Sequence, residues 1–153
     1  MDWRKHVKKY VWDENKTPYL IPVVKLSKPQ AQKEIFIYAL FVAVLFSLFT
    51  LILSVEAKLE GNFKSIGMAF YAFSVICAAV LLGLSRHVYP AYYCVTAPVA
   101  AFIYIAATGL NPNLGTMDHV LLMIFTGLWA RYTLRVVAIA DAYPEMADQP
   151  QAQ

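Results

Sequence analysis

Four cationic side chains are the strongest candidates for chemistry in this sequence: Arg86, His87, Arg131 and Arg135. They come from two segments that lie far apart along the chain. Arg131 and Arg135 are four residues apart, so a helix would place them on one face. Guanidinium groups match the geometry of phosphate oxygens. The sequence therefore predicts a site for anionic lipid headgroups, provided that the fold brings both segments to one membrane surface.

The same cationic cluster has two further interpretations. Basic and aromatic residues at the ends of membrane helices commonly serve as interface anchors, and the excess of positive charge in cytoplasmic loops would explain their position. Arginine, histidine, tyrosine and tryptophan would also be suitable contacts for a quinone or another amphiphile in the cytoplasmic leaflet. The residue types leave open an anchor, a lipid site and an amphiphile pocket.

Other chemical sites are not expected from the residue pattern. A bis-histidine haem needs two histidines at similar depth, but His87 and His119 belong to opposite membrane faces and His6 lies outside the spans. The sequence has no metal-ligand spacing, no glycine-rich phosphate loop and no nucleophile motif. Cys77 and Cys94 each lie in an apolar segment, where a buried free cysteine is common. The sequence thus predicts no catalytic, cofactor-binding or metal-binding residues.

The elements that must position the cationic cluster are membrane-spanning helices. Hydrophobic residues make up 59% of the 153 residues and charged residues only 15%, whereas soluble domains carry about a quarter. Residues 35–55, IFIYALFVAVLFSLFTLILSV, contain no charge. As a helix they would measure about 31 Å, close to the hydrocarbon thickness of a bilayer. Lipid cannot hydrogen-bond an open backbone, so this segment must be helical there.

The pattern predicts an all-α integral membrane protein with four transmembrane helices in an antiparallel bundle. The membrane domain is expected at residues 34–142, with spans at 35–55, 66–84, 90–108 and 119–137. The fourth span is the least regular, because its uncharged run covers only residues 119–130. It can cross a bilayer only if the following arginines extend to the headgroups.

Two local signals refine these helices. Ser27 followed by Gln30 has the spacing of a helix N-terminus and places the first helical residue near position 28. Ala79 and Gly83 are small residues four apart in the second span, a spacing that lets another helix approach closely.

Residues 1–33 are expected to form a cytoplasmic arm. Up to residue 34 the chain carries eight Lys and Arg against four Asp and Glu, while the remainder carries five against six. Near-helical spacing of aromatic and basic residues predicts an amphipathic helix on anionic headgroups. Its predicted interfacial residues are Trp3, Arg4, Lys5, Lys8, Lys9 and Trp12. No basic stripe continues beyond this arm, so nucleic acid is not an expected partner.

The rest of the chain adds little to this organisation. Residues 143–153 read as a polar C-terminal tail. The first apolar run begins only at Ile35 and is too long for the apolar region of a signal peptide, so no cleavable leader is expected.

The charge distribution predicts the orientation. Four spans would place 11 of the 13 Lys and Arg on the side of the two termini, which indicates an N-in, C-in protein, with a bacterial inner membrane as the expected location. The expected role is a non-catalytic accessory or scaffold subunit that acts through helix packing and its arm. Its expected partners are the bilayer and either another membrane protein or further copies of itself. The alternative is an enzyme or carrier that handles a lipid or quinone at the cationic cluster.

The four-span orientation makes a direct prediction for reporter fusions. A reporter fused after Gln153 should lie on the cytoplasmic side, and one inserted near Pro112 on the opposite side, because the fourth span separates them. Alkaline phosphatase and fluorescent-protein fusions measure the two locations. The same location for both reporters would contradict the model of four spans.

Overall fold

The computed structural model describes residues 22–60, 63–108 and 115–147, and these ranges are largely helical. Its elements are η2 (Val23–Lys25), α2 (Lys28–Glu60), α3 (Phe63–Ser85), α4 (Val88–Thr108), α5 (Thr116–Ala142) and η3 (Tyr143–Glu145). Each of the four long helices contains a stretch that is long and apolar enough to cross a membrane. The prediction of an all-α fold with four helices long and apolar enough to span a membrane is therefore confirmed for the described residues.

Local hydrogen bonds explain where two of the helices begin. The Ser27 backbone N–H and hydroxyl both donate to Gln30 Oε1, at 3.1 and 3.0 Å, and the Ala31 N–H donates to the Ser27 carbonyl. The predicted start of the first helix is thus confirmed. At α5 the N–H of Gly115 donates to Asp118 Oδ2 at 3.1 Å. In both places a side chain satisfies a backbone donor that the helix itself leaves open.

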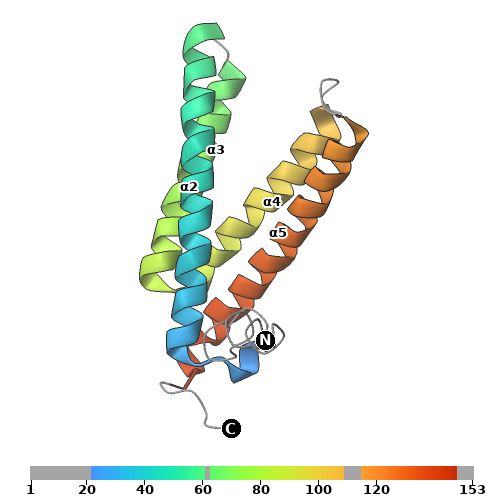
Figure 1. Cartoon of the computed structure of the whole chain (residues 1–153). Helices are drawn as coiled ribbons and strands as arrows, with labels where there is room; N and C mark the ends of the chain where they lie inside the picture. Colours follow the sequence, from blue (N-terminus) through green and yellow to red (C-terminus); the bar gives the residue numbers. More distant parts are fainter. Residues whose placement is uncertain (1–21, 61–62, 109–114, 148–153) are drawn as a thin grey trace, which may run out of the picture.

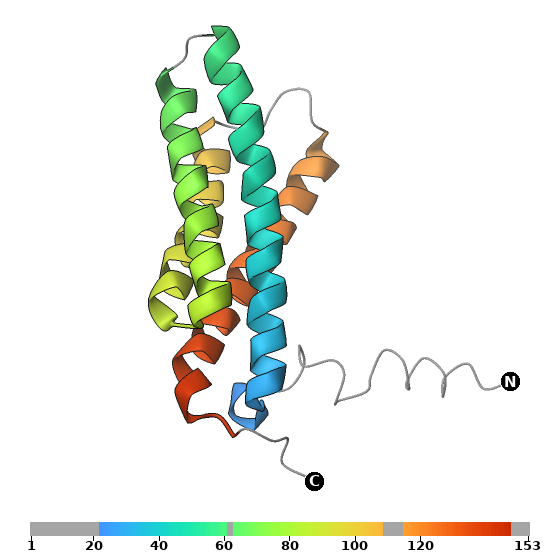
Figure 2. The same ribbon diagram turned by 90° about the vertical axis from the view of Figure 1, so that its left-hand side faces the viewer.

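The four helices are arranged as two hairpins that meet at one end. α2 packs most extensively on α3, and α4 packs on α5. The chain reverses direction from each helix to the next, and the two hairpins diverge from the end where α2 begins and α5 ends (Figure 1). The view turned by 90° places the α2–α3 hairpin in front of α4 and α5 (Figure 2). The molecule therefore has the outline of a V.

The buried core lies in the half of the molecule where the hairpins meet. Ile35, Tyr38 and Val42 of α2 are almost fully buried, as are Val136 and Ile139 of α5. Among the described side chains of α2, none beyond Phe46 is buried, and on α4 none beyond Pro98 is buried. Toward the open end each hairpin therefore packs chiefly on itself.

This core also explains the apolar sequence at the end of the fourth helix. α5 continues without a break to Ala142, and its last turns lie beneath the turn between α3 and α4 (Figure 2). Its buried residues there are Val136, Val137, Ile139 and Ala140. These side chains are covered by protein, so their apolar character requires no lipid around this part of the helix.

The α2–α3 hairpin depends on a close approach at Gly83. A Cβ atom on Gly83 would lie 3.3 Å from the Cβ of Ala39 on α2, tighter than ordinary van der Waals contact. Ala79, one turn earlier on α3, is fully buried. The predicted close-packing role of this small-residue pair is confirmed, because a larger side chain would separate the helices.

Gly83→Leu should destabilise the protein by about 1–3 kcal/mol, because the added side chain must displace α2. Gly127→Leu is the matched control, since a Cβ at Gly127 meets nothing within 4 Å. Thermal unfolding in mild detergent, followed by circular dichroism, compares the two variants with the wild type. Equal stability of both variants would show that α2 and α3 do not approach each other at Gly83.

Candidate functional site

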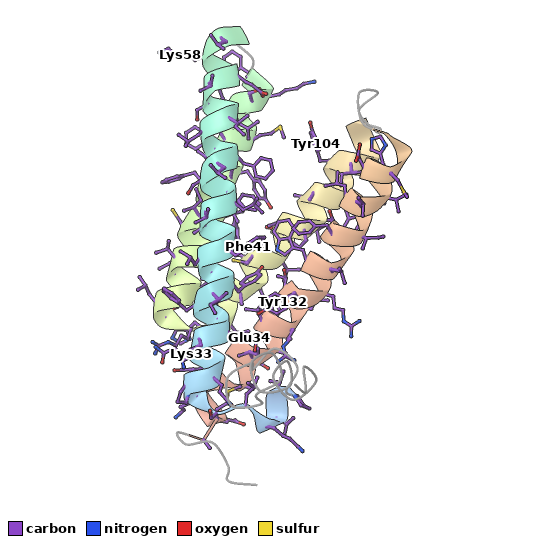
Figure 3. All side chains as sticks on the ribbon, viewed as in Figure 1. Lys33, Glu34, Phe41, Lys58, Tyr104 and Tyr132 are labelled. Carbon is purple, nitrogen blue, oxygen red and sulfur yellow. The ribbon has the colours of Figure 1, made fainter. Side chains whose placement is uncertain are left out.

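A buried ion pair joins the two hairpins. The Arg135 Nε–H of α5 donates to Glu34 Oε1 of α2 at 2.7 Å, and Arg135 Nη2 donates to Glu34 Oε2 at 3.3 Å. The Glu34 side chain is fully buried and that of Arg135 is 23% exposed. Glu34 points across to α5, whereas its neighbour Lys33 points away from it (Figure 3). The two-point geometry fixes both the distance and the rotation of α2 relative to α5.

A second polar contact lies one helical turn further along α2. The Tyr38 hydroxyl donates to Thr133 Oγ1 at 2.9 Å, and Thr133 Oγ1 donates its own proton to the Trp129 carbonyl at 2.8 Å. Tyr38 and Thr133 are both buried, and the Tyr38 ring lies 5.8 Å from that of Tyr132. Both hydroxyl protons are thus satisfied inside the protein, as a buried polar group requires.

Aromatic rings close this interface toward the open end of the V. The Trp129 ring lies 6.4 Å from Phe41, edge to face, and 6.2 Å from Phe46. Figure 3 shows Phe41 at the level where the two hairpins separate. Such aromatic pairs add about 0.5–1.5 kcal/mol beyond the area that they bury. We call the set Glu34, Tyr38, Phe41, Phe46, Trp129, Thr133 and Arg135 the inter-hairpin contact.

A third contact ties the turn between α3 and α4 to the end of α5. Arg86 has a positive φ of 57°, and its N–H donates to the Leu82 carbonyl at 2.9 Å, which closes the last turn of α3. Its Nη1 lies 3.3 Å from the Tyr143 hydroxyl, and the guanidinium carbon lies 5.7 Å from the Tyr143 ring centroid. A left-handed conformation costs a non-glycine residue roughly 1–2 kcal/mol. The contacts with Tyr143 offset this strain.

The four predicted headgroup residues have different surroundings. Arg86 contacts Tyr143, and Arg135 is paired with Glu34. His87 and Arg131 are exposed. The proposed interfacial residues of the arm, Trp3 to Trp12, lie outside the described residues. Lipid binding by the cluster therefore stays a prediction, with two of its members also engaged inside the protein.

Glu34, Tyr38 and Thr133 belong to the inter-hairpin contact, although the residue pattern did not predict them as members of a site. Glu34 directly precedes the uncharged run 35–55, so the residue pattern indicated no role for it beyond the start of the membrane domain. The signal was nevertheless present, since Glu34 lies on the same helical face as Ala31, Tyr38 and Val42, all of which are buried. A charge on the buried face of a helix indicates a partner on another helix.

The inter-hairpin contact has the chemistry of a structural joint. Within the described ranges no three His, Cys, Asp or Glu side chains lie together in a group that could hold a metal ion. The ion pair is bidentate and the hydroxyl groups are satisfied by neighbouring side-chain and backbone atoms. What this arrangement can do is hold two hairpins together at one end.

Comparisons with models of protein families, with curated proteins and with solved structures found no match for this chain. The geometry described above is therefore the basis for the functional argument.

Removing one partner of the ion pair should strongly destabilise the protein. Glu34→Met or Arg135→Leu alone should cost about 3–5 kcal/mol, because each leaves the other side chain of the pair without its opposite charge. The double variant Glu34→Met with Arg135→Leu should recover most of that loss, because buried apolar residues can replace an ion pair.

Unfolding in mild detergent measures the three variants, with Arg131→Leu as the control because Arg131 is exposed on the same helix. If the double variant loses as much free energy of unfolding as the two single variants together, the two side chains do not interact.

Proposed function

We propose that this protein is a non-catalytic accessory or scaffold subunit of a membrane complex, built as an antiparallel four-helix protein with both termini in the cytoplasm. The single observation that supports this proposal is the incomplete core. The buried apolar side chains of the four helices are concentrated in the half that contains the inter-hairpin contact, and the hairpins diverge beyond it (Figure 1). A diverging pair of hairpins offers apolar surface at which a transmembrane helix of a partner can pack.

The apolar surface of the open half is extensive on the helices of both hairpins. On α2 the exposed residues include Leu51, Ile52 and Val55, and on α4 they include Ile103 and Tyr104. Tyr104 lies on the side of α4 that faces the α2–α3 hairpin (Figure 3). A partner helix in this position would contact both hairpins at once, while the ion pair at the other end keeps their spacing fixed.

The location and orientation belong to the same proposal. Bacterial inner membranes carry anionic lipids on the cytoplasmic side, which suits the basic residues 1–33. The described start of the chain is firmly attached to the bundle, because Leu26 is buried and the Lys28 N–H donates to the Ala147 carbonyl at 3.0 Å. The arm would thus leave the bundle beside the end of α5, where partner proteins and headgroups are both within reach.

Purification in mild detergent tests the proposal against its alternative. An accessory subunit should co-purify at constant stoichiometry with a larger membrane complex, and the complex should survive size-exclusion chromatography. An enzyme or carrier that uses Arg86, His87, Arg131 and Arg135 should instead purify alone with a lipid or quinone that organic extraction and mass spectrometry identify. The second result would reject the accessory role.

A further inference from the structure

Four hydroxyl side chains form a network between α3 and α4 on the outer surface of the molecule. Tyr71 and Thr96 lie 2.9 Å apart, and Ser74 and Tyr93 lie 2.7 Å apart, measured between their side-chain oxygens. Thr96 and Tyr93 are exposed, and Tyr71 and Ser74 are half-buried. This network lies within two candidate membrane spans, where hydrogen bonds between helices replace those that lipid cannot supply.

The direction of every hydrogen bond follows from the number of protons. Ser74 Oγ donates to the Tyr71 carbonyl and Thr96 Oγ1 donates to the Tyr93 carbonyl, both at 2.7 Å. A hydroxyl group has one proton, so Ser74 must accept from the Tyr93 hydroxyl and Thr96 must accept from the Tyr71 hydroxyl. All four protons are used inside the network. The oxygens of Tyr71 and Tyr93 are left as acceptors with no proton to donate.

A free donor lies next to these acceptors. Tyr92 is 57% exposed, and among the described residues its hydroxyl has no hydrogen-bond partner. On α2 the exposed Ser47 and Ser54 differ in this respect, because each donates its proton to a carbonyl of its own helix. An unpaired hydroxyl proton is costly in hydrocarbon. The outer face of α4 thus carries an unused donor and an unused acceptor on the consecutive residues Tyr92 and Tyr93. Tyr89, whose hydroxyl also has no partner among the described residues, lies in the first turn of the helix.

We propose that this face is a dimer interface between two copies of the chain, in which the Tyr92 hydroxyl of each copy donates to the Tyr93 oxygen of the other. A two-fold axis along the membrane normal makes each copy present the same patch, so the patch must be complementary to itself. This axis also places each residue and its symmetry copy at the same depth in the membrane. Consecutive helical residues differ in depth by only about 1.5 Å, so a residue can also reach the neighbour of its copy. Tyr92 and Tyr93 meet both requirements: one supplies a donor and the other an acceptor, and as consecutive residues they lie at nearly the same depth.

The remaining residues of the outer face of α4 suit this contact. They follow one another at spacings of three and four residues: Tyr89, Tyr92, Thr96, Val99 and Ile103. All of them are exposed in the single chain. This spacing forms the seam along which two helices pack with a left-handed crossing. The inference rests on the proposed membrane placement and names one partner within it, a second copy.

The test uses the full chain, labelled with donor and acceptor fluorophores and reconstituted in dioleoylphosphatidylcholine vesicles. Energy transfer should persist when the protein is diluted into more lipid, well above the level for random proximity. Tyr92→Phe should weaken association about tenfold, because two symmetric hydrogen bonds are lost per dimer. Tyr93→Phe removes the acceptors of the same bonds, so the double variant should associate about as well as either single variant.

Ser47→Ala is the control and should leave association unchanged, because Ser47 lies on α2, outside the proposed interface, and its hydroxyl already donates to the Ala43 carbonyl of its own helix. Circular dichroism of each variant establishes that it is folded. Random-proximity transfer for the wild type, or full association of folded Tyr92→Phe, would overturn the proposal. If no larger complex is found in detergent, the accessory role is rejected, whereas the dimer proposal is not affected. The failure of one proposal can therefore be distinguished from the failure of the other.

Discussion

The fold depends on the burial of one carboxylate between two helical hairpins. Glu34 is fully enclosed, and a charge in that position is tolerated only when a partner of opposite charge reaches it. Arg135 does so with two nitrogens, which fixes the crossing of α2 and α5 near the end where the hairpins meet. Such pairs contribute little net stability compared with apolar packing, but separating the two charges costs about 3–5 kcal/mol, so arrangements that part Glu34 from Arg135 are disfavoured. The pair therefore defines which hairpins meet, and at which end.

Beyond this pair, the packing changes from protein core to separate hairpins over a short distance. Tyr38 and Thr133 continue the contact with hydroxyl groups, and Trp129 with Phe41 and Phe46 ends it with aromatic rings. Further along, the described side chains of α2 are no longer buried. The order from charged to hydroxyl to apolar side chains follows the decrease in available water from the headgroups toward the centre of a bilayer.

Most of the hydroxyl groups described in the candidate spans follow one rule, which is that the proton finds an acceptor within the protein. Ser47, Thr50 and Ser54 donate to carbonyls of their own helix. Between α3 and α4 the same rule produces a network that joins two helices. Tyr89 and Tyr92 depart from this rule among the described residues. Tyr92 lies one turn further into α4 than Tyr89, and its surface is the one to which we assign a partner.

The sequence by itself determined the helices and their number. Uncharged runs of membrane length, the spacing of Ser27 and Gln30, and the small pair Ala79 and Gly83 act through neighbouring residues or through helix periodicity, so they can be recognised locally. Only the tertiary structure decided that Glu34 and Arg135, 101 residues apart, form a pair. It also decided that Val136, Val137, Ile139 and Ala140 face protein. Hydropathy indicates an apolar environment without distinguishing lipid from a protein core.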